Sequence, residues 1–299
     1  MSVLIVGSTA LDSIKTSAGS AHRLLGGSAC HASVAASFFG PAHLVGIVGD
    51  DFPPAYTRLL RRRSINLDAL QVVPGKTFHW SGEYEVNMNN RRTHATELGV
   101  FETFRPTLPE HLRDLRYILL ANIAPSLQLH VLSQLRRPRF VIADTMDLWL
   151  NIALKDLLRL IRRVDALVVN DSEARQLTHE DNLPTALRKL HRLGPAYVIV
   201  KKGEHGAVLS SPRGMFVAPA FPLRKVVDPT GAGDSFVGGL LGYLGASRGS
   251  VDANLRKAII YGSAVASFCC EDFGLRRTSR ITRADIESRV QALERLSHF

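Results

Sequence analysis

The chain has 299 residues, of which 45% are hydrophobic, and its 37 Lys and Arg against 27 Asp and Glu give a formal net charge of +10. No run approaches the roughly 18 consecutive apolar residues of a membrane span, and residues 1–10 lack the basic start of a signal peptide, so we expect a soluble, cytoplasmic enzyme with no membrane partner. The Arg clusters are dispersed and lack interleaved aromatic residues, which argues against a nucleic-acid partner.

Short apolar runs alternate with segments of helical period along most of the chain, a pattern typical of an α/β fold built on a largely parallel sheet. The runs lack polar alternation, which predicts strands buried on both faces. The expected strands are Ser2–Gly7, His43–Val48, Tyr117–Ala121, Phe140–Ala143, Ala166–Val169 and Tyr197–Val200. The expected helices are Ala29–Phe39, Pro54–Arg62, Ser126–Gln134, Ala153–Arg163, Thr185–Arg192, Gly233–Leu244, Asn254–Cys270 and Arg283–Leu296.

One stretch departs from this alternation. Residues 77–104 are rich in Thr, aromatic and polar residues, with Asn89-Asn90 at a turn, which predicts an antiparallel flap. Together with residues 13–25, it would form a small β layer over the carboxyl edge of the main sheet, where open α/β sheets bind ligands. The chain has no linker or repeat, so we predict one domain over residues 1–299 with these two segments as a lid. Cys30, Cys269 and Cys270 lack metal-ligand spacing and are expected to be reduced thiols.

The sequence VDPTGAGDSF places an acid directly after a glycine turn at the start of an expected helix. Gly231, Ala232 and Gly233 have almost no side-chain bulk, so their backbone N–H groups could approach an anion, and the first helical turn adds free donors and a favourable dipole. Asp234 would then accept a proton from a hydroxyl that attacks phosphorus. The alternative is an ordinary glycine turn with an acid that complements the helix dipole.

Asn170-Asp171-Ser172-Glu173 follows an apolar run and therefore lies at the carboxyl end of a strand. Asn with Glu three residues later suits a helix capping box, which is a purely structural device. The same pair could instead serve a Mg²⁺ and phosphate site, because magnesium keeps several waters and needs few carboxylates, so Glu173 could act through water.

Two weaker signals follow glycines. Gly26-Gly27 precede a helix and Asp12 follows the first strand; glycines admit a small hydroxylated ligand close to the backbone, and a carboxylate can bind two sugar hydroxyls. A Gly-Gly turn beside an acid is also a common structural feature. The segment from Lys201 to Gly206, KKGEHG, could be only a strand-ending turn. Gly75-Lys76-Thr77 lacks the first glycine of a Walker motif, and no dinucleotide fingerprint follows a strand.

Together and in this order, the glycine pair, GIVGDD, NDSE, KKGEHG and DPTGAGDSF resemble the ribokinase-like carbohydrate kinases of the PfkB family along nearly the whole chain. The resemblance implies a three-layer α/β/α fold with a central, mostly parallel sheet and a β lid that closes over the acceptor and excludes water. It also implies transfer of the γ-phosphoryl group of ATP, with Mg²⁺, to a hydroxyl of a sugar, polyol or nucleoside. A homodimer formed through the lid is a further implication.

By resemblance, Asp234 is the general base and Gly231 to Gly233 form the anion hole. Asp12, Gly26, Gly27 and His31 map to the acceptor. The nucleotide and Mg²⁺ site maps to Asn170, Glu173, Lys201, Gly203, Gly206 and Thr230, with residues 261–274 near the adenine. Asp228 maps to a K⁺ site of potassium-dependent relatives.

Several alternatives stay open. His31 stands where sugar-specific members often have Asn, which puts ribose in doubt, although a packed histidine is equally consistent. His79, Trp80 and Arg92 could select the acceptor, with stacking on a nucleobase as one route. A noncatalytic nucleotide or sugar sensor on the same fold is the alternative function.

Overall fold

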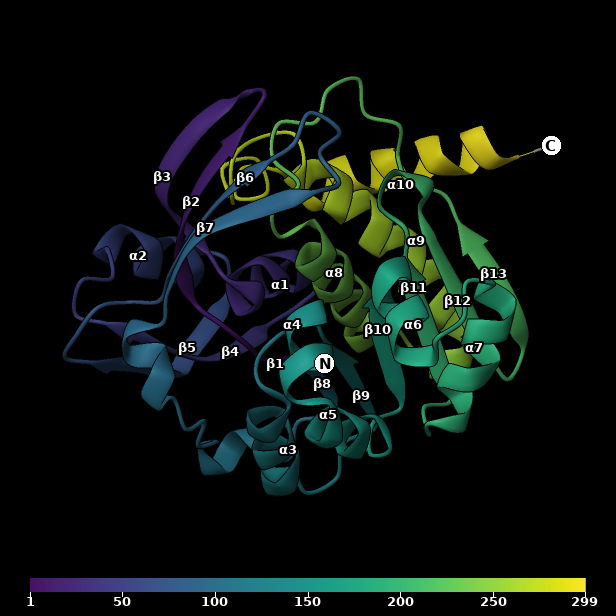
Figure 1. Cartoon of the computed structure of the whole chain (residues 1–299), viewed down its shortest axis with the longest axis horizontal. Coiled ribbons are helices and arrows are strands. Elements are labelled where there is room, and N and C mark those ends of the chain that lie inside the picture. The colour runs from purple at the N-terminus through teal and green to yellow at the C-terminus, as the bar shows by residue number, and fades with distance from the viewer. Residues whose placement is uncertain (299) are drawn as a thin grey trace.

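The computed structural model describes residues 1–298, and its centre is a nine-stranded sheet within that range (Figure 1). The strand order is β13-β12-β11-β10-β9-β8-β1-β4-β5; β11, β12 and β13 pair antiparallel and all other neighbours pair parallel. The strands are β1 Val3–Val6, β4 Ala42–Gly49, β5 Ile65–Val73, β8 Tyr117–Leu120, β9 Phe140–Asp144, β10 Ala166–Asn170, β11 Tyr197–Lys201, β12 Ala207–Ser211 and β13 Gly214–Ala218. All six predicted strands are present.

Helices cover both faces of this sheet, which confirms the three-layer α/β/α fold. Alternate strand residues point to opposite faces: Val3 and Ile5 join one core with the helices α1, α8 and α9, while Leu4 and Val6 join a second core on the other face. The helices are α1 Ser28–Ser37, α2 Pro54–Arg62, α3 Pro125–Gln134, α4 Asp147–Ile152, α5 Leu154–Ile161, α6 Asp171–Thr178, α7 Leu183–Arg192, α8 Ala232–Ala246, α9 Val251–Cys269 and α10 Arg283–Ser297.

A second, four-stranded sheet projects from the carboxyl side of the main sheet (Figure 1). Its order is β3-β2-β6-β7, with β2 Ala10–Thr16, β3 Gly19–Gly26, β6 His79–Tyr84 and β7 Arg91–Glu97. The predicted antiparallel flap is therefore present as β6 and β7, and β6 pairs parallel with β2. We call this second sheet the small sheet; its action as a lid stays a prediction.

The small sheet has two different faces. On the inner face, Ile14 and Leu24 are buried in an apolar cluster with Phe273, and Trp80 and Tyr84 pack against that cluster. On the outer face, Lys15 forms an ion pair with Glu83 at 2.8 Å. The inner face is therefore the one that lies over the rest of the molecule.

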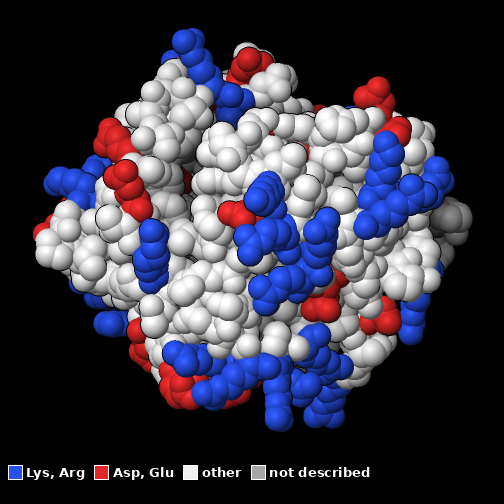
Figure 2. All heavy atoms as spheres, turned by 60° about the horizontal axis from the view of Figure 1, so that its bottom comes forward, with Lys and Arg blue, Asp and Glu red and all other residues white. Residues whose placement is uncertain are grey.

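Among residues 1–298, no helix is long and apolar enough to cross a membrane. On the face shown in Figure 2, Lys and Arg form several separate groups, with uncharged and acidic residues between them.

Candidate active site

The glycine turn lies at the amino end of α8. Gly231 is the N-cap of this helix with φ +76°, a left-handed conformation that favours glycine. A Cβ at this position would lie 2.2 Å from Nδ1 of His31. The turn therefore requires glycine for two reasons, backbone conformation and the histidine ring behind it. Free N–H groups and the helix dipole at this end favour an anion, and the anion site itself stays a prediction.

Asp234 lies in the first turn of α8 and is partly buried. Burial, together with the neighbouring Asp144 carboxylate, raises the pKa of Asp234 to about 6, although the Lys201 ammonium opposes the shift. The carboxylate is thus ionised at neutral pH and has a higher proton affinity than a free aspartate, as suits a general base.

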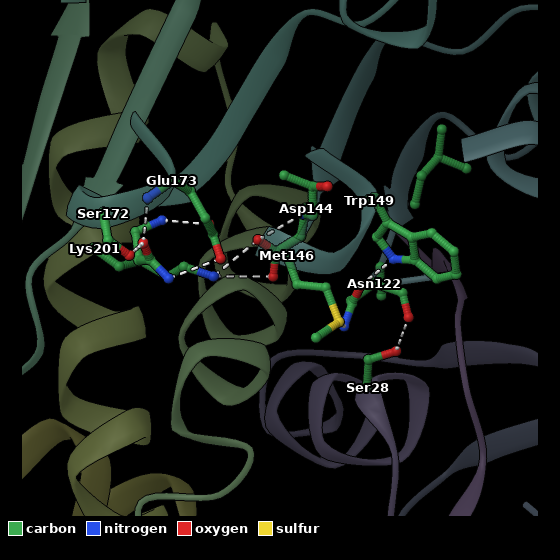
Figure 3. A network of polar contacts seen from close by, with 12 residues as sticks. Ser28, Asn122, Asp144, Met146, Trp149, Ser172, Glu173 and Lys201 are labelled. Carbon is green, nitrogen blue, oxygen red and sulfur yellow. Dashed lines mark hydrogen bonds and ion pairs between the residues drawn. The ribbon is translucent and has the colours of Figure 1, made fainter. Parts of the chain in front are cut away.

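A buried ion pair lies beside this turn (Figure 3). Lys201 Nζ donates to Asp144 Oδ1 at 2.8 Å and to Oδ2 at 3.1 Å, and the Asp144 side chain is only 4% exposed. A Cβ on Gly233 would lie 3.3 Å from the same Nζ. The ammonium is therefore held in place next to the α8 amino end. Its pKa is raised because Asp144 and Glu173 together outweigh the effect of burial.

Asn170 and Glu173 form a complete capping box at the start of α6. The Asn170 Oδ1 accepts from Glu173 N at 2.8 Å, and Glu173 Oε2 accepts from Asn170 N at 2.7 Å. The structural interpretation of NDSE is thus correct. Burial raises the pKa of Glu173 to about 7, while the Lys201 charge lowers it. This oxygen-rich pair, at the carboxyl end of β10, has the donor type that Mg²⁺ binds directly or through water.

A cavity of about 450 Å³ opens beside these groups, large enough for a nucleotide. It extends from Lys201 past Gly203 and Gly206 to Gly233, and α9 closes its far side. The lining includes Ser263, Ala266, Ser267 and Cys270, which belong to the segment predicted near the adenine. Asn87, Met88 and Asn89, at the tip of the β6–β7 hairpin, also line it.

Asp12 and the glycine pair meet at the base of the small sheet. Asp12 is 5% exposed, and a Cβ on Gly26 would lie 1.9 Å from its Oδ2. Gly27 has φ +88°, and a Cβ there would lie 2.5 Å from the backbone oxygen of Ser8. Burial raises the pKa of Asp12 to about 7, with the Gly27 N–H opposing and the Asp228 and Asp234 charges adding to the shift. The Asp12 carboxylate thus packs closely against backbone atoms, and the charge of Asp234 contributes to its raised pKa.

His31 lies behind the glycine turn and is 1% exposed. Its Nδ1 is 3.7 Å from Cys269 Sγ, and burial lowers its pKa to about 4, so the ring is neutral. This favours the packed interpretation. Its Nε2 is buried and has no hydrogen-bond partner among residues 1–298.

Asp228 is completely buried and holds the loop before the turn. Its Oδ1 accepts from Thr230 N and its Oδ2 from Gly274 N, both at 2.9 Å. Thr230 Oγ1 lies 3.3 Å from the Tyr84 hydroxyl of β6. The described contacts of Asp228 are therefore structural, and a K⁺ role stays a prediction.

Two parts of this site were not anticipated. Asp144 is one: it directly follows the apolar run 140–143, and an acid at the end of a buried strand is a signal that could have found it. The hairpin tip is the other, because its approach to the nucleotide cavity depends on how two sheets are arranged, which no local pattern encodes.

A glycine turn at a helix N-terminus, an adjacent acid and a nucleotide-sized cavity are typical of a phosphotransferase. Comparison with known proteins agrees: the sequence profile of the pfkB family carbohydrate kinases matches residues 2–282. The chain therefore belongs to the PfkB family, as its motifs predict, and is a phosphotransferase with an alcohol group as acceptor.

Among similar proteins, a cytidine kinase of Thermococcus kodakarensis is 30% identical over 257 residues, which cover 83% of this chain and 90% of the relative. A nucleoside kinase of Burkholderia thailandensis in complex with inosine has a TM-score of 0.80 at 23% identity, covering 97% of this chain and 98% of the other. A putative ribokinase II of E. coli with ATP and Mg²⁺ has a TM-score of 0.81 at 17% identity, covering 97% and 99%. The two structures show that the fold is shared.

Proposed function

We propose that this protein transfers the γ-phosphoryl group of ATP to a hydroxyl of a nucleoside, with Asp234 as the general base. The observation that carries the proposal is the position of the α8 amino end. It borders the nucleotide-sized cavity through Gly233 and Lys201, and Asp234 in its first turn is close enough to the buried Asp12 to help raise the pKa of that carboxyl. Phosphoryl transfer needs donor and acceptor on opposite sides of one anion site.

The nucleotide side is served by groups of three kinds. Gly203, Gly206 and α9 line the cavity for the base and sugar, and Lys201 contributes a fixed positive charge. Asn170 and Glu173 would hold Mg²⁺, partly through water; when bound, the ion neutralises phosphate charge. The capping box already fixes both side chains, so this site is built before the ligand arrives.

On the reacting side, the hydroxyl proton would pass to the Asp234 carboxylate as the oxygen attacks phosphorus. The N–H groups of the Gly231–Gly233 turn would receive the transferred group, with the α8 dipole adding favourable potential. The buried His31 ring packs against Gly231 and supports the turn from behind.

On the acceptor side, Asp12 would accept hydrogen bonds from two hydroxyls of the sugar ring. Trp80 pairs with Asp12 in the register of β2 and β6, so the two side chains lie on the same face of the small sheet. An aromatic ring beside a hydroxyl-binding carboxylate suits a nucleoside, whose base can stack while its ribose is held. The similarity to a cytidine kinase and to nucleoside kinases supports the same acceptor class.

The test measures ADP formation by purified protein with ATP, Mg²⁺ and K⁺ against a panel of nucleosides, sugars and polyols. We expect turnover with at least one nucleoside, and Asp234→Asn should lower kcat by about 10²–10⁴ while ATP binding persists. Asp156→Asn, on the surface helix α5, is the matched control for loss of one carboxylate. If Asp234→Asn retains wild-type turnover, Asp234 is not the general base and the proposed mechanism is refuted.

Binding of ATP and a nucleoside without turnover would instead identify a sensor. Substituting Na⁺ for K⁺ in the same assay tests the predicted cation dependence. Light scattering tests the predicted homodimer through the small sheet, whose outer face carries the Lys15–Glu83 ion pair.

A further inference from the structure

A second hollow lies away from the kinase site, between α2 and the segment that leads into α10. Its volume is about 710 Å³. It shares no lining residue with the nucleotide cavity. Its lining consists of four arginines with small or apolar residues between them: Ala55, Arg58, Leu59, Arg62, Arg63, Ser279, Arg280 and Ile281. No acidic residue belongs to this lining, and we call this hollow the arginine groove.

The arginines of the groove have unequal roles. Arg63 is fixed: its Nη2 donates to Thr278 O at 2.6 Å and to Ile281 O at 3.0 Å, and its guanidinium lies 4.6 Å from the centre of the Phe38 ring. Arg58, Arg62 and Arg280 are exposed, and none of them forms an ion pair with a carboxylate within the described part of the chain. Three guanidinium groups thus face one hollow without a counter-charge.

Helix electrostatics explain only part of this arrangement. Arg61 and Arg62 in the last turn of α2 complement the negative end of the helix dipole, as cations commonly do. That argument gives no reason for Arg280, which comes from a segment more than two hundred residues later and lines the same groove. Arginines that converge from two segments repel one another unless an anion lies between them.

We propose that the arginine groove binds a small polyphosphate anion. Guanidinium groups bind phosphate oxygens in pairs of parallel hydrogen bonds, and a chain of two or three phosphate groups would reach arginines on both walls. The apolar floor formed by Leu59 and Ile281 offers no competing carboxylate. Inorganic tripolyphosphate and a nucleoside triphosphate share this recognised chemistry.

The groove is connected to the kinase site through the backbone. Arg63 holds the oxygens of Thr278 and Ile281, and four residues earlier Gly274 N donates to Asp228 Oδ2. Asp228 in turn accepts from Thr230 N, next to the glycine turn. An anion in the groove should therefore slow amide exchange over residues 274–281.

The test is calorimetric titration of the full chain with inorganic tripolyphosphate in metal-free buffer. The double variant Arg62→Ala/Arg280→Ala removes two groove arginines, and Arg61→Ala/Arg276→Ala removes two exposed arginines outside its lining, with the same change in charge. We expect the groove variant to weaken one binding event at least tenfold, and the control variant to bind like the wild type. The nucleotide cavity is unchanged in both.

Equal binding by all three proteins, or equal loss in both double variants, would overturn the proposal, because the attraction would then come from general surface charge. A parallel titration with ATP distinguishes a nucleotide ligand from a simple phosphate chain. If ATP binds more tightly than tripolyphosphate and the groove variant loses this difference, the ligand is a nucleotide; if the two affinities are equal, the groove recognises the phosphate chain alone. Groove-dependent binding of a single-stranded oligonucleotide, with none of tripolyphosphate, would also refute it. Since none of these residues lies in the kinase site, the outcome is independent of the proposed kinase chemistry.

Discussion

Asp234 has surroundings that determine the pH range over which it can accept a proton. Because burial beside Asp144 raises its pKa to about 6, kcat at saturating MgATP should fall as the pH drops through that value. In Asp144→Asn a nearby negative charge is removed and Lys201 loses its partner. Both changes favour the ionised form, so the acid limb of the profile should move to lower pH.

The matched control for this profile is Asp156→Asn, whose carboxylate lies on the surface of α5. Its acid limb should coincide with that of the wild type. An Asp144→Asn profile that only decreases in height, without moving along the pH axis, would show that Asp144 supports the fold and does not tune the base.

Gly231 allows a second prediction at this scale. Gly231→Ala introduces positive-φ strain and a Cβ that collides with the His31 ring, so we expect kcat to fall at least 100-fold and stability to fall by about 1–3 kcal/mol. Gly214→Ala separates the two effects, because Gly214 has φ +97° but open space around its Cβ. Stability measured by denaturant and kcat measured by ADP release check the prediction; equal effects in both variants would contradict it.

At the scale of elements, Tyr84 connects the small sheet to the loop before α8 through its 3.3 Å contact with Thr230 Oγ1. Tyr84→Phe should weaken the closed arrangement by about 0.5–1.5 kcal/mol, the usual net value of one hydrogen bond. We expect a several-fold rise in the acceptor KM and more ATP hydrolysis without acceptor. Tyr197→Phe, which removes a hydroxyl bonded to Asp252 on α9, is the control, and identical behaviour of the two variants would argue against a lid role.

The helices and strands differ in how well the sequence predicts them. Doubly buried strands such as β1 and β10 have a strong apolar signal, and amphipathic helices such as α5 and α7 repeat apolar residues with the helical period. Those elements were therefore predicted within a few residues. The strands β5, β12 and β13 were missed, and each lies at or near an edge of the sheet. β5 mixes polar and apolar residues, while β12 and β13 have only five residues each and are partly exposed.

The residues of the candidate site also differ in how well the sequence predicts their positions. The glycine turn and NDSE are local sequences with a local geometry, and both were placed at helix N-termini as expected. The Asp144–Lys201 pair joins residues 57 positions apart, and the hairpin tip reaches the nucleotide cavity across two sheets. Contacts of this kind depend on tertiary packing and leave no local pattern.

For the whole molecule, Asp12 links function to the free energy of unfolding. Its folded pKa of about 7 lies above the unfolded value of about 3.8, so the folded state binds this proton more tightly and loses stability as pH rises between these values. From pH 5 to pH 8 the loss amounts to about 2–3 kcal/mol. Asp12→Asn should therefore gain in melting temperature relative to wild type more at pH 8 than at pH 5, while losing activity. A gain that does not vary with pH would contradict this.

The small sheet contacts both proposed substrate regions through one continuous element. Its base carries Asp12 on β2, six residues after the end of β1. Its β6–β7 tip lines the nucleotide cavity, where Asn89 Nδ2 lies 3.4 Å from Glu204 Oε1. If each ligand favours the same position of this sheet, each must raise the affinity for the other by the same factor. The test is to measure the dissociation constant of each ligand in the presence and absence of the other. A coupling of this kind would mean that ATP is bound tightly and cleaved only when an acceptor is also bound.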